Sequence, residues 1–385
     1  MSSIASTLAI LERLIAFDTT SRNSNLKLIA WVEAFLAKRG IATHRVESAD
    51  GAKSNLYALI GPEVEGGVVL SGHTDVVPVD DQVWSSDPWV LTEREGKFYG
   101  RGVADMKSFL ALSLAHVDAA READLKKPII LAFSYDEEVG CLGAPAMIAE
   151  IGERLPKPAA VIVGEPTEMR AVSGHKGIRV YEVEVTGREA HSSQIHQGVS
   201  AVMEALDLMN AVAAMAAEQD HSDTSSPFDP PGATLTIGKV DGGTASNILA
   251  GHCTFIWDLR TPPGVDADVI EQRFMKEVER VDARIKARAP EGGVRVRRRS
   301  NTPSMAPAPE SEAEMLARAI NGDNGLIAAA YAAEGGLFQE AGFPAVICGP
   351  GSILQAHQPD EWIERTQLEQ GADFLQKLIA RLASA

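Results

Sequence analysis

The first part of the chain alternates between two kinds of hydrophobic pattern. Apolar residues three and four positions apart predict helices over 26–38 and 106–120. Short continuous apolar runs at Val68–Leu70, Ile129–Phe133 and Val161–Val163 predict strands that are buried on both faces. Helices that alternate with such strands are typical of an α/β domain with a largely parallel sheet.

A different pattern occupies the middle of the chain. After Gly177 the expected order is strand, helix, strand, strand, helix, strand, which matches a ferredoxin-like βαββαβ unit. From about residue 302 the α/β pattern resumes and completes the first sheet. We therefore expect a compact domain of residues 178–300, inserted into a catalytic α/β domain made of residues 1–177 and 301–385.

Composition and charge exclude several classes of function. Hydrophobic residues make up 45% of the chain, which is enough to fill sizeable cores. The net charge of −17 argues against a nucleic-acid partner, whose phosphates require a basic surface. The arginine run at 295–299 alternates with valine and is expected to be an exposed strand face. No apolar run is long enough to span a membrane.

The cysteines point to a reducing compartment. Cys141, Cys253 and Cys348 are widely spaced and odd in number, so they do not form a disulfide framework. The first sixteen residues carry Glu12 and Arg13, unlike the apolar core of a secretory signal. We therefore expect a cytoplasmic protein.

Residues of the types that can bind metal ions follow four of the predicted strands, and one more such residue precedes a helix. Residues at the carboxyl ends of strands converge in open α/β sheets, although they lie far apart in sequence. The set comprises His73, Asp75, Asp105, Glu137, Glu138, Glu165 and His357. Imidazole suits zinc, and carboxylates suit hard or borderline cations. The set predicts two zinc ions that share a bridging carboxylate, an arrangement that recurs in hydrolases.

Each of these residues also has an ordinary structural explanation. A histidine at a strand end is more often a hydrogen-bonding residue than a metal ligand. Asp105 is a good candidate for a helix N-cap, and the adjacent Glu137 and Glu138 fit a solvated loop. Their joint occurrence at one sheet edge favours the metal site.

Four segments around these residues resemble the M20 metallopeptidase family. They are Ser71–Pro78, Gly100–Lys107, Asp136–Gly140 and Val163–Thr167. The resemblance covers essentially the whole chain. It implies a zinc-peptidase-like sheet domain with an inserted ferredoxin-like lid and dimerisation domain. It also implies hydrolysis of an amide bond with two Zn²⁺ ions, for which Co²⁺ can substitute.

The resemblance assigns a role to each candidate ligand. His73 and Glu165 would hold one zinc ion, Glu138 and His357 would hold the other, and Asp105 would bridge them. These assignments are consistent with the residue types that zinc prefers.

The resemblance also implies the catalytic residues of the sheet domain. Asp75 would orient His73, as carboxylates commonly do for metal-bound imidazoles. Glu137 would be the general base, which takes a proton from the metal-bridging water and returns it to the leaving amine.

Three residues of the inserted domain match positions that contact the substrate in this family. His191 would stabilise the oxyanion, often across a dimer interface. Asn247 would contact the substrate, and Arg260 would bind its α-carboxylate with a bidentate fork. Without the resemblance, a surface histidine, an ordinary turn and a solvated arginine are the simpler interpretations.

The segment Gly349–Glu361 is most similar to family members that release acetate from N-acetyl-L-ornithine in arginine biosynthesis. The run Tyr331–Gly336 departs from the usual family pattern. It therefore does not identify which substrate side chain the pocket accepts. N-acetylcitrulline, N-succinyl-diaminopimelate or a dipeptide are alternative substrates. A catalytically silent scaffold is a remote alternative, because every expected ligand and the base are present. We expect a small-molecule N-acyl amino acid as substrate and a homodimer formed through the inserted domain.

Overall fold

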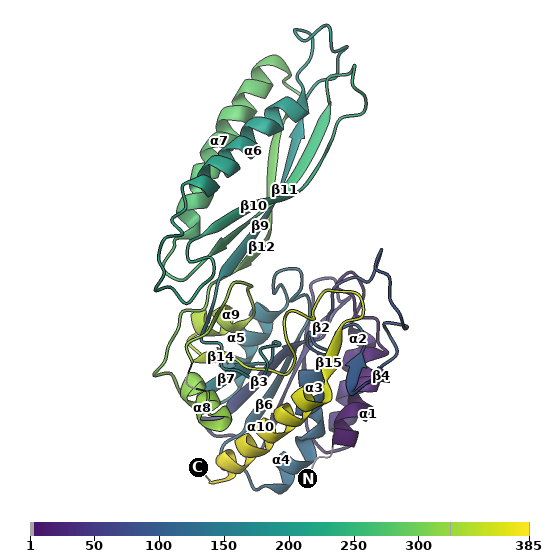
Figure 1. Cartoon of the computed structure of the whole chain (residues 1–385), viewed down its shortest axis with the longest axis vertical. Coiled ribbons are helices and arrows are strands. Elements are labelled where there is room, and N and C mark those ends of the chain that lie inside the picture. Colours follow the sequence, from purple (N-terminus) through teal and green to yellow (C-terminus); the bar gives the residue numbers. More distant parts are fainter. Residues whose placement is uncertain (1–3, 324, 385) are drawn as a thin grey trace. The chain divides into compact units, whose positions relative to one another are not determined.

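The computed structural model describes residues 4–323 and 325–384, which divide into two compact units (Figure 1). Unit 1 contains the described residues up to His175, Met305–Ala328 and those from Ala333 onward. Unit 2 contains Lys176–Ser304 and Ala329–Ala332. The short segment 329–332 thus belongs to the unit of the inserted domain, whereas the sequence assigns it to the catalytic domain.

A six-stranded sheet forms the centre of unit 1. Its order is β1 (His44–Glu47), β2 (Ser54–Ile60), β6 (Ile129–Ser134), β3 (Val68–His73), β7 (Ala160–Val163) and β14 (Ala345–Ile347). Strands β6, β3, β7 and β14 are parallel, and β2 and β1 are antiparallel. The predicted α/β fold is confirmed, with an antiparallel pair at one edge that the apolar runs did not indicate.

Helices cover both faces of this sheet (Figure 1). Ile129, Leu131 and Phe133 of β6 share one core cluster with α1 (Ile4–Ile15), α2 (Leu26–Ala37), α3 (Lys107–Ala115), α4 (Val117–Glu122), α8 (Glu312–Asn321) and α10 (Arg365–Ser384). The intervening Ile130 and Ala132 are buried on the other face, where α5 (Ala144–Arg154) and α9 (Gly335–Glu340) pack. Burial on both faces explains the continuous apolar runs.

The helix predicted over 106–120 is two helices. It breaks at His116, which joins α3 to α4 with φ −95° and ψ 1°. The imidazole Nδ1 of His116 lies 2.8 Å from the carbonyl oxygen of Leu112, so the ring donates to the backbone at the break. None of the helices within residues 4–323 and 325–384 is long and apolar enough to cross a bilayer.

The remaining strands of unit 1 are short. They are β4 (Thr92–Arg94), β5 (Lys97–Tyr99), β8 (Gly174–His175) and β15 (Trp362–Glu364), and β13 (Ala328–Ala329) is a further two-residue strand. Strands β15, β5 and β4 form an antiparallel sheet of their own. This small sheet joins the segment after His357 to the segment before Asp105.

Unit 2 has the predicted βαββαβ order. Its elements are β9 (Gly177–Thr186), α6 (Ala201–Ala217), β10 (Thr234–Gly242), β11 (His252–Thr261), α7 (Ala267–Arg288) and β12 (Gly293–Thr302). The antiparallel sheet has the order β10-β11-β9-β12, and α6 and α7 lie side by side on one face (Figure 1). Between the layers the ring of Trp257 stacks on Tyr181 at 4.4 Å and packs against Phe274. The ferredoxin-like fold is confirmed.

The arginine run of unit 2 lies on β12 and is paired with acidic side chains. Arg297 forms an ion pair with Glu182 of β9, and Arg298 forms one with Glu271 of α7 at 3.0 Å. The run therefore extends to both faces of β12, and these charges are offset within its own unit.

Candidate metal centre

Three parallel strands end side by side at one edge of the unit 1 sheet. Strand β3 ends at His73, which pairs in register with Ser134, the last residue of β6. Strand β7 ends at Val163 on the other side of β3. The residues that follow carry Glu137–Glu138 and Glu165, so the sheet itself brings these carboxylates next to His73.

A glycine is required where β7 turns into Glu165. A Cβ atom on Gly164 would lie 2.0 Å from Cγ of Phe109 in α3. Such an overlap has no local remedy, because both groups are buried between the sheet and the helix. The close approach of α3 to β7 therefore fixes the position of Glu165.

Asp105 lies between the two candidate histidine ligands. Its Oδ1 is 2.9 Å from Nε2 of His73, and its Oδ2 is 3.3 Å from Nε2 of His357. The residue is not the N-cap of α3, since Met106 occupies that position. Each carboxylate oxygen of Asp105 therefore faces a different histidine, which is the geometry that a bridging ligand needs.

Each histidine is also close to one further carboxylate. Oε1 of Glu165 lies 3.7 Å from Nε2 of His73, and Oε2 of Glu138 lies 3.0 Å from Nε2 of His357. The fold thus brings all five predicted ligands together. His357 is the most accessible, with its side chain 51% exposed, whereas His73 is 1% exposed.

Unpaired oxygen atoms inside the cluster fit a bound cation. Oε1 of Glu138 and Oε1 of Glu165 are buried and have no hydrogen-bond partner within the described part of the chain. Buried polar atoms without a partner are rare and costly in native proteins. The donor set of imidazole nitrogen and carboxylate oxygen is one that zinc accepts, so the residues present fit a metal ion.

The electrostatics of the cluster lead to the same conclusion. Burial and the nearby Asp105 raise the pKa of the Glu138 carboxyl to about 7. Burial, Asp105 and Glu137 raise the pKa of Glu165 well above its ordinary value. Hydrogen bonds to Asp105 and Glu138 raise the pKa of His357 to about 10. A divalent cation would stabilise the ionised carboxylates and the neutral imidazoles together.

Glu137 lies beside the same cluster. One oxygen of its carboxylate is within 4.8 Å of ligand atoms of His73 and Glu165. Burial raises the pKa of the Glu137 carboxyl well above its ordinary value, against the opposing charge of His73. The thiol of Cys141 lies 3.4 Å from Oε1 of Glu137 and donates to it. Glu137 therefore lies beside the ligand atoms of His73 and Glu165, where a general base for a metal-bound water would be needed.

Asp75 makes contacts that the sequence did not predict. Its backbone carbonyl oxygen lies 2.8 Å from Nδ1 of His73, while its carboxylate oxygen Oδ1 is 3.6 Å from the same atom. The carboxylate instead accepts the backbone N–H groups of Glu137 at 3.1 Å and of Glu138 at 3.3 Å. It also accepts the hydroxyl of Ser21 at 2.7 Å. Asp75 thus holds the loop that carries Glu137 and Glu138.

Two residues of the cluster's loops have left-handed backbone conformations: Asp136, next to Glu137, and the candidate ligand His357. The φ angle is 57° at Asp136 and 62° at His357. Such conformations cost on the order of 1–3 kcal/mol in residues other than glycine and are concentrated at functional sites. An ion pair between Asp136 and Lys53 holds the first of these loops.

Two buried residues near the centre were missed by the sequence analysis. Ser21 lies at the start of the chain and carried no signal in its surroundings. Lys107 is fully buried and donates from Nζ to the carbonyl oxygen of Phe17 at 2.8 Å. Burial lowers the pKa of Lys107 to about 7. Its place two residues after Asp105, in a segment already singled out, was the available signal.

His191 and Asn247 lie in neighbouring loops of unit 2. The N–H of Ser192 donates to the carbonyl oxygen of Asn247 at 2.9 Å, and His191 pairs with Ile248 in an isolated β-bridge. Nδ1 of His191 accepts the backbone N–H of Ser193 at 3.2 Å. The proton of the neutral imidazole therefore resides on Nε2, which is free to donate from this exposed side chain.

Arg260 lies at the opposite end of the unit 2 sheet. It pairs in register with Ile178 at the start of β9, whereas His191 follows Thr186 at the end of β9. These two ends are about 26 Å apart, at about 3.3 Å per strand residue. The five residues from Thr186 to His191 reach at most about 17 Å, and their pairing leads away from Arg260. Unit 2 therefore brings His191 and Asn247 together but keeps both far from Arg260.

Arg260 is held by its own neighbours. Its Nε lies 3.2 Å from Oδ2 of Asp258, and its Nη1 donates to the carbonyl oxygen of Ala330 at 3.4 Å. The buried Lys176 is near enough that burial, and then the charge of Arg260, lower its pKa. Two cationic side chains at one end of the sheet are suited to an anionic group.

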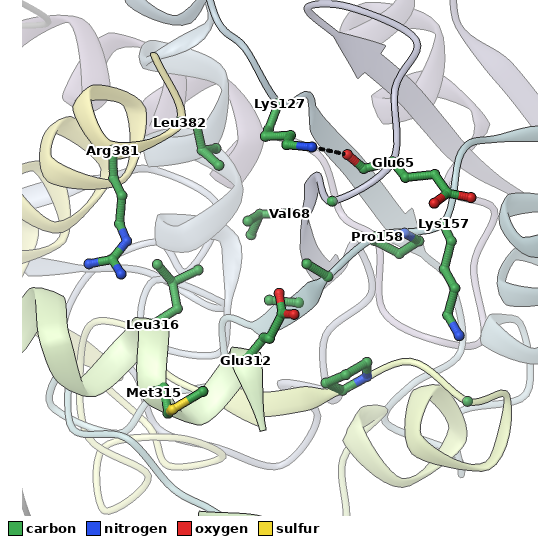
Figure 2. Close-up of a pocket in the computed structure, with 15 residues that line it drawn as sticks. Glu65, Val68, Lys127, Lys157, Pro158, Glu312, Met315, Leu316, Arg381 and Leu382 are labelled. Atoms are coloured by element: carbon green, nitrogen blue, oxygen red, sulfur yellow. Dashed lines mark hydrogen bonds between the residues drawn. The ribbon is translucent and has the colours of Figure 1, made fainter. Parts of the chain in front are cut away.

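A cavity of about 890 Å³ lies at the opposite edge of the unit 1 sheet (Figure 2). Val68 and Ala160, the first residues of β3 and β7, line it, together with Lys127 and Arg381. Lys127 donates to the carbonyl oxygen of Glu65 at 2.9 Å across its rim. The cavity is therefore at the amino ends of the strands and is separate from the carboxylate cluster.

Comparisons with known proteins agree with this geometry. The family model for peptidase family M20/M25/M40 matches residues 69–381. The acetylornithine deacetylase of Myxococcus xanthus is 33% identical over 385 residues, covering 97% of this chain and 96% of the relative. That of Pasteurella multocida is 31% identical over 396 residues and covers 100% of both chains.

Solved structures share the fold. A metallo-carboxypeptidase of the M20 family from Sulfolobus solfataricus has a TM-score of 0.80 at 16% identity, covering 98% of this chain and 99% of the other. Human carnosine dipeptidase 1 has a TM-score of 0.77 at 18% identity, covering 99% and 97%. With the family model matched over most of the chain and relatives above 30% identity over nearly its full length, the chain belongs to peptidase family M20/M25/M40.

Proposed function

We propose that the protein is a dinuclear zinc hydrolase that removes the acetyl group from N-acetyl-L-ornithine, as a step of arginine biosynthesis. The observation that carries the proposal is the position of Asp105, whose two carboxylate oxygens face His73 and His357 at 2.9 and 3.3 Å. A related M20 structure is itself described as a dinuclear metal-binding peptidase.

In this proposal His73 and Glu165 would hold one zinc ion, Glu138 and His357 would hold the other, and Asp105 would bridge them. When bound, the pair supplies Lewis acidity and lowers the pKa of a water molecule from about 15.7 towards about 7. Co²⁺ is expected to substitute, because it accepts the same nitrogen and oxygen donors.

Glu137 performs the proton transfers. Its carboxylate takes a proton from the attacking water as the water adds to the acyl carbonyl carbon. The same carboxyl group then returns this proton to the amine nitrogen as the amide bond breaks, so that ornithine and acetate leave. Asp75 supports both steps, since it holds the backbone of Glu137 and Glu138.

Unit 2 provides the groups that bind the substrate. We assign the α-carboxylate to Arg260, whose guanidinium is flanked by the cationic Lys176. His191 is the proposed oxyanion donor, because its Nε2–H is available for donation. Asn247, in the adjoining loop, contacts the substrate beside it.

The separation of Arg260 from His191 supports a homodimer. One copy of unit 2 does not present both ends of its sheet to one substrate, so His191 and Asn247 act on the site of a second copy. Exposed apolar side chains on unit 2 support an interface there, among them Met203 and Leu206 on α6 and Val240 on the edge strand β10. In this arrangement the inserted domain is both lid and dimerisation domain.

Mixing two inactive variants tests this arrangement. Glu137→Gln and His191→Ala should each be inactive alone. After the two are unfolded together and refolded, a hybrid dimer contains one site with both Glu137 and His191 intact. Recovery of up to about one quarter of wild-type activity is expected, whereas no recovery would place His191 in its own subunit's site.

Substrate preference rests on the relatives, whose printed name is acetylornithine deacetylase. The test is kcat/KM of zinc-loaded protein on N-acetyl-L-ornithine, N-acetylcitrulline, N-succinyl-diaminopimelate and a dipeptide. A hundredfold lead for acetylornithine, about 2.7 kcal/mol, supports the proposal. A lead for another substrate changes only the pocket assignment, and no cleavage of any would support a catalytically silent scaffold.

We also propose the cytoplasm as the compartment. Cys141, Cys253 and Cys348 are all buried and form no disulfide within the described residues, which is usual where thiols are kept reduced. Measuring activity in soluble and periplasmic or secreted fractions of the source cells tests this assignment.

A further inference from the structure

Glu361 is a buried carboxylate close to the proposed metal centre. It is 1% exposed and lies four residues after His357, immediately before β15. Neither the candidate ligands nor the substrate residues include it. A carboxylate this deeply buried requires several partners to offset its lost hydration.

Four donors surround its two oxygen atoms. Oε2 accepts Nη1 of Arg101 at 2.7 Å and the backbone N–H of Gly102 at 2.9 Å. Oε1 accepts the backbone N–H groups of Ala104 at 2.8 Å and of Asp105 at 3.0 Å. The side chain of Glu361 therefore bonds directly to the backbone of the bridging aspartate.

The backbone of Glu361 is fixed to the same segment. Its carbonyl oxygen accepts the N–H of Gly100 at 3.1 Å, and the following Trp362 pairs with Tyr99 where β15 joins β5. Arg101 is itself buried and also donates to Gln82 at 2.5 Å. The loop 100–105 and the segment after His357 thus form one hydrogen-bonded unit.

We propose that Glu361 is a positioning residue for the metal centre, which holds the bridging Asp105 and the ligand His357 at a fixed separation before metal binds. The proposal rests on the proposed dinuclear centre. Asp105 and His357 come from segments more than 250 positions apart in the sequence. Glu361 links these segments, because it bonds directly to the backbone of Asp105. Gln82 adds a second link, since its Nε2 donates to the carbonyl oxygen of His357 at 3.0 Å and its Oε1 accepts Arg101. Glu361 accepts backbone N–H groups of loop 102–105, just as Asp75 accepts those of Glu137 and Glu138.

The contacts identify the informative substitution. In Glu361→Gln an NH₂ group replaces one of the two oxygens. Whichever oxygen is replaced, the NH₂ group faces two N–H donors. At least two of the four hydrogen bonds become contacts between donors, although size and shape are retained. Glu361→Asp keeps the charge but shortens the side chain, so it should retain part of the function.

The experiment measures Zn²⁺ affinity of metal-free protein by competition with a chromophoric chelator. We expect Glu361→Gln to bind the weaker zinc ion about 10- to 100-fold less tightly than wild type, which is typical when a group that supports a metal ligand is removed. The zinc affinity of Glu361→Asp should lie between those of wild type and Glu361→Gln.

The matched control is Glu314→Gln. Glu314 is also 1% exposed and accepts an arginine, Arg318, at 2.7 Å, but it lies in α8 away from the ligands. This variant should lose stability without losing zinc affinity. Equal zinc affinity in wild type and Glu361→Gln overturns the inference alone, whereas absence of zinc binding by wild type overturns the proposed centre as well.

Hydrogen exchange of metal-free wild type tests the inference even where the variants fold poorly. The amide protons of Gly102, Ala104 and Asp105 should exchange at least tenfold more slowly than those of Asp81, Val83 and Trp84, whose N–H groups form no hydrogen bond within the described part of the chain. Unprotected amides at these three positions would show that Glu361 does not preorganise Asp105, and would overturn the inference.

Discussion

Nδ1 of His73 is 2.8 Å from the backbone carbonyl oxygen of Asp75 and 3.6 Å from its carboxylate. The imidazole is therefore oriented by the backbone, and Nε2 is left for the metal. Because the carboxylate is not needed for this bond, it is available to the loop that carries Glu137 and Glu138. One residue thus connects the end of β3 with the loop after β6.

The backbone of Asp75 orients His73 and its carboxylate holds the loop of Glu137 and Glu138, so a substitution can separate the two roles. Asp75→Asn replaces one acceptor oxygen by an NH₂ group that faces N–H or O–H donors. We expect kcat to fall about 10- to 100-fold, because the loop of Glu137 and Glu138 loses an acceptor. The zinc ion assigned to Glu138 should bind more weakly, whereas the ion assigned to His73 should stay bound, since the backbone still orients His73. Activity and zinc per chain measure the two effects. Ser21→Ala removes a single donor, and its kcat should fall less than tenfold. Loss of both zinc ions in proportion to activity would instead support the carboxylate as the group that orients His73.

The second prediction concerns the proposed base. Glu137→Gln should lower kcat by about 10²- to 10⁴-fold, the usual contribution of general acid–base catalysis. Zinc content should remain at the wild-type level, because the five proposed ligands are unchanged. Activity measured beside metal analysis distinguishes a base from a ligand. Parallel loss of zinc and activity would make Glu137 a ligand.

Removal of metal should destabilise the protein. Zinc at 100 times its dissociation constant contributes about 2.7 kcal/mol to the free energy of unfolding, so a chelator should lower the unfolding temperature measurably. Glu165→Gln is the control. It removes a proposed ligand, and it also removes a buried carboxylate that the nearby Asp105 and Glu137 repel. It should lose the part of the zinc-dependent rise in unfolding temperature that comes from the ion assigned to His73 and Glu165, without melting below metal-free wild type. Identical melting of wild type with and without chelator would argue against a metal that binds only the native state.

Arg260 should determine recognition of the α-carboxylate. Arg260→Ala removes a charged hydrogen bond worth about 1.5–3 kcal/mol, so kcat/KM on N-acetyl-L-ornithine should fall about 10- to 100-fold. The loss on the methyl ester of the same substrate should be much smaller. Arg260→Lys should be intermediate, since an ammonium group lacks the bidentate fork. Equal losses on acid and ester would remove Arg260 from this role.

His116 should make folding stability depend on pH. Burial lowers its pKa in the folded protein below the unfolded value near 6.5. The unfolded state therefore binds more protons below pH 6.5, and stability falls as the pH decreases, by at most about 1.4 kcal/mol per pH unit. Denaturant unfolding at pH 7.5 and 5.5 should show a larger loss in wild type than in His116→Gln. The same pH dependence in both would exclude His116 as the cause.

Local patterns determined a large part of this protein. The continuous apolar runs at Val68–Leu70 and Ile129–Phe133 follow from burial on both sheet faces, so they were readable as parallel strands. The clustering of the candidate ligands after these strands was also predictable, because parallel strands end at a common edge. The assignment of His73 with Glu165 to one metal ion, and of Glu138 with His357 to the other, is implied by the family resemblance and stays a prediction.

Other features depend on tertiary contacts that no local pattern encodes. The antiparallel β1 and β2 pair with strands distant in sequence, and the helix break at His116 reflects its own bond to Leu112. The separation of His191 from Arg260 follows from strand register, which places them at opposite ends of one sheet.

The carboxylates of Asp75 and Glu361 show the same limit most clearly. Asp75 follows the candidate ligand His73 by two residues, and Glu361 follows the candidate ligand His357 by four. The hydrogen-bond donors to both carboxylates include backbone N–H groups on other segments. A sequence specifies which side chains are available as acceptors. Which amides point at them is decided only when the chain has folded, because every residue except proline carries the same N–H donor and only tertiary structure selects among them.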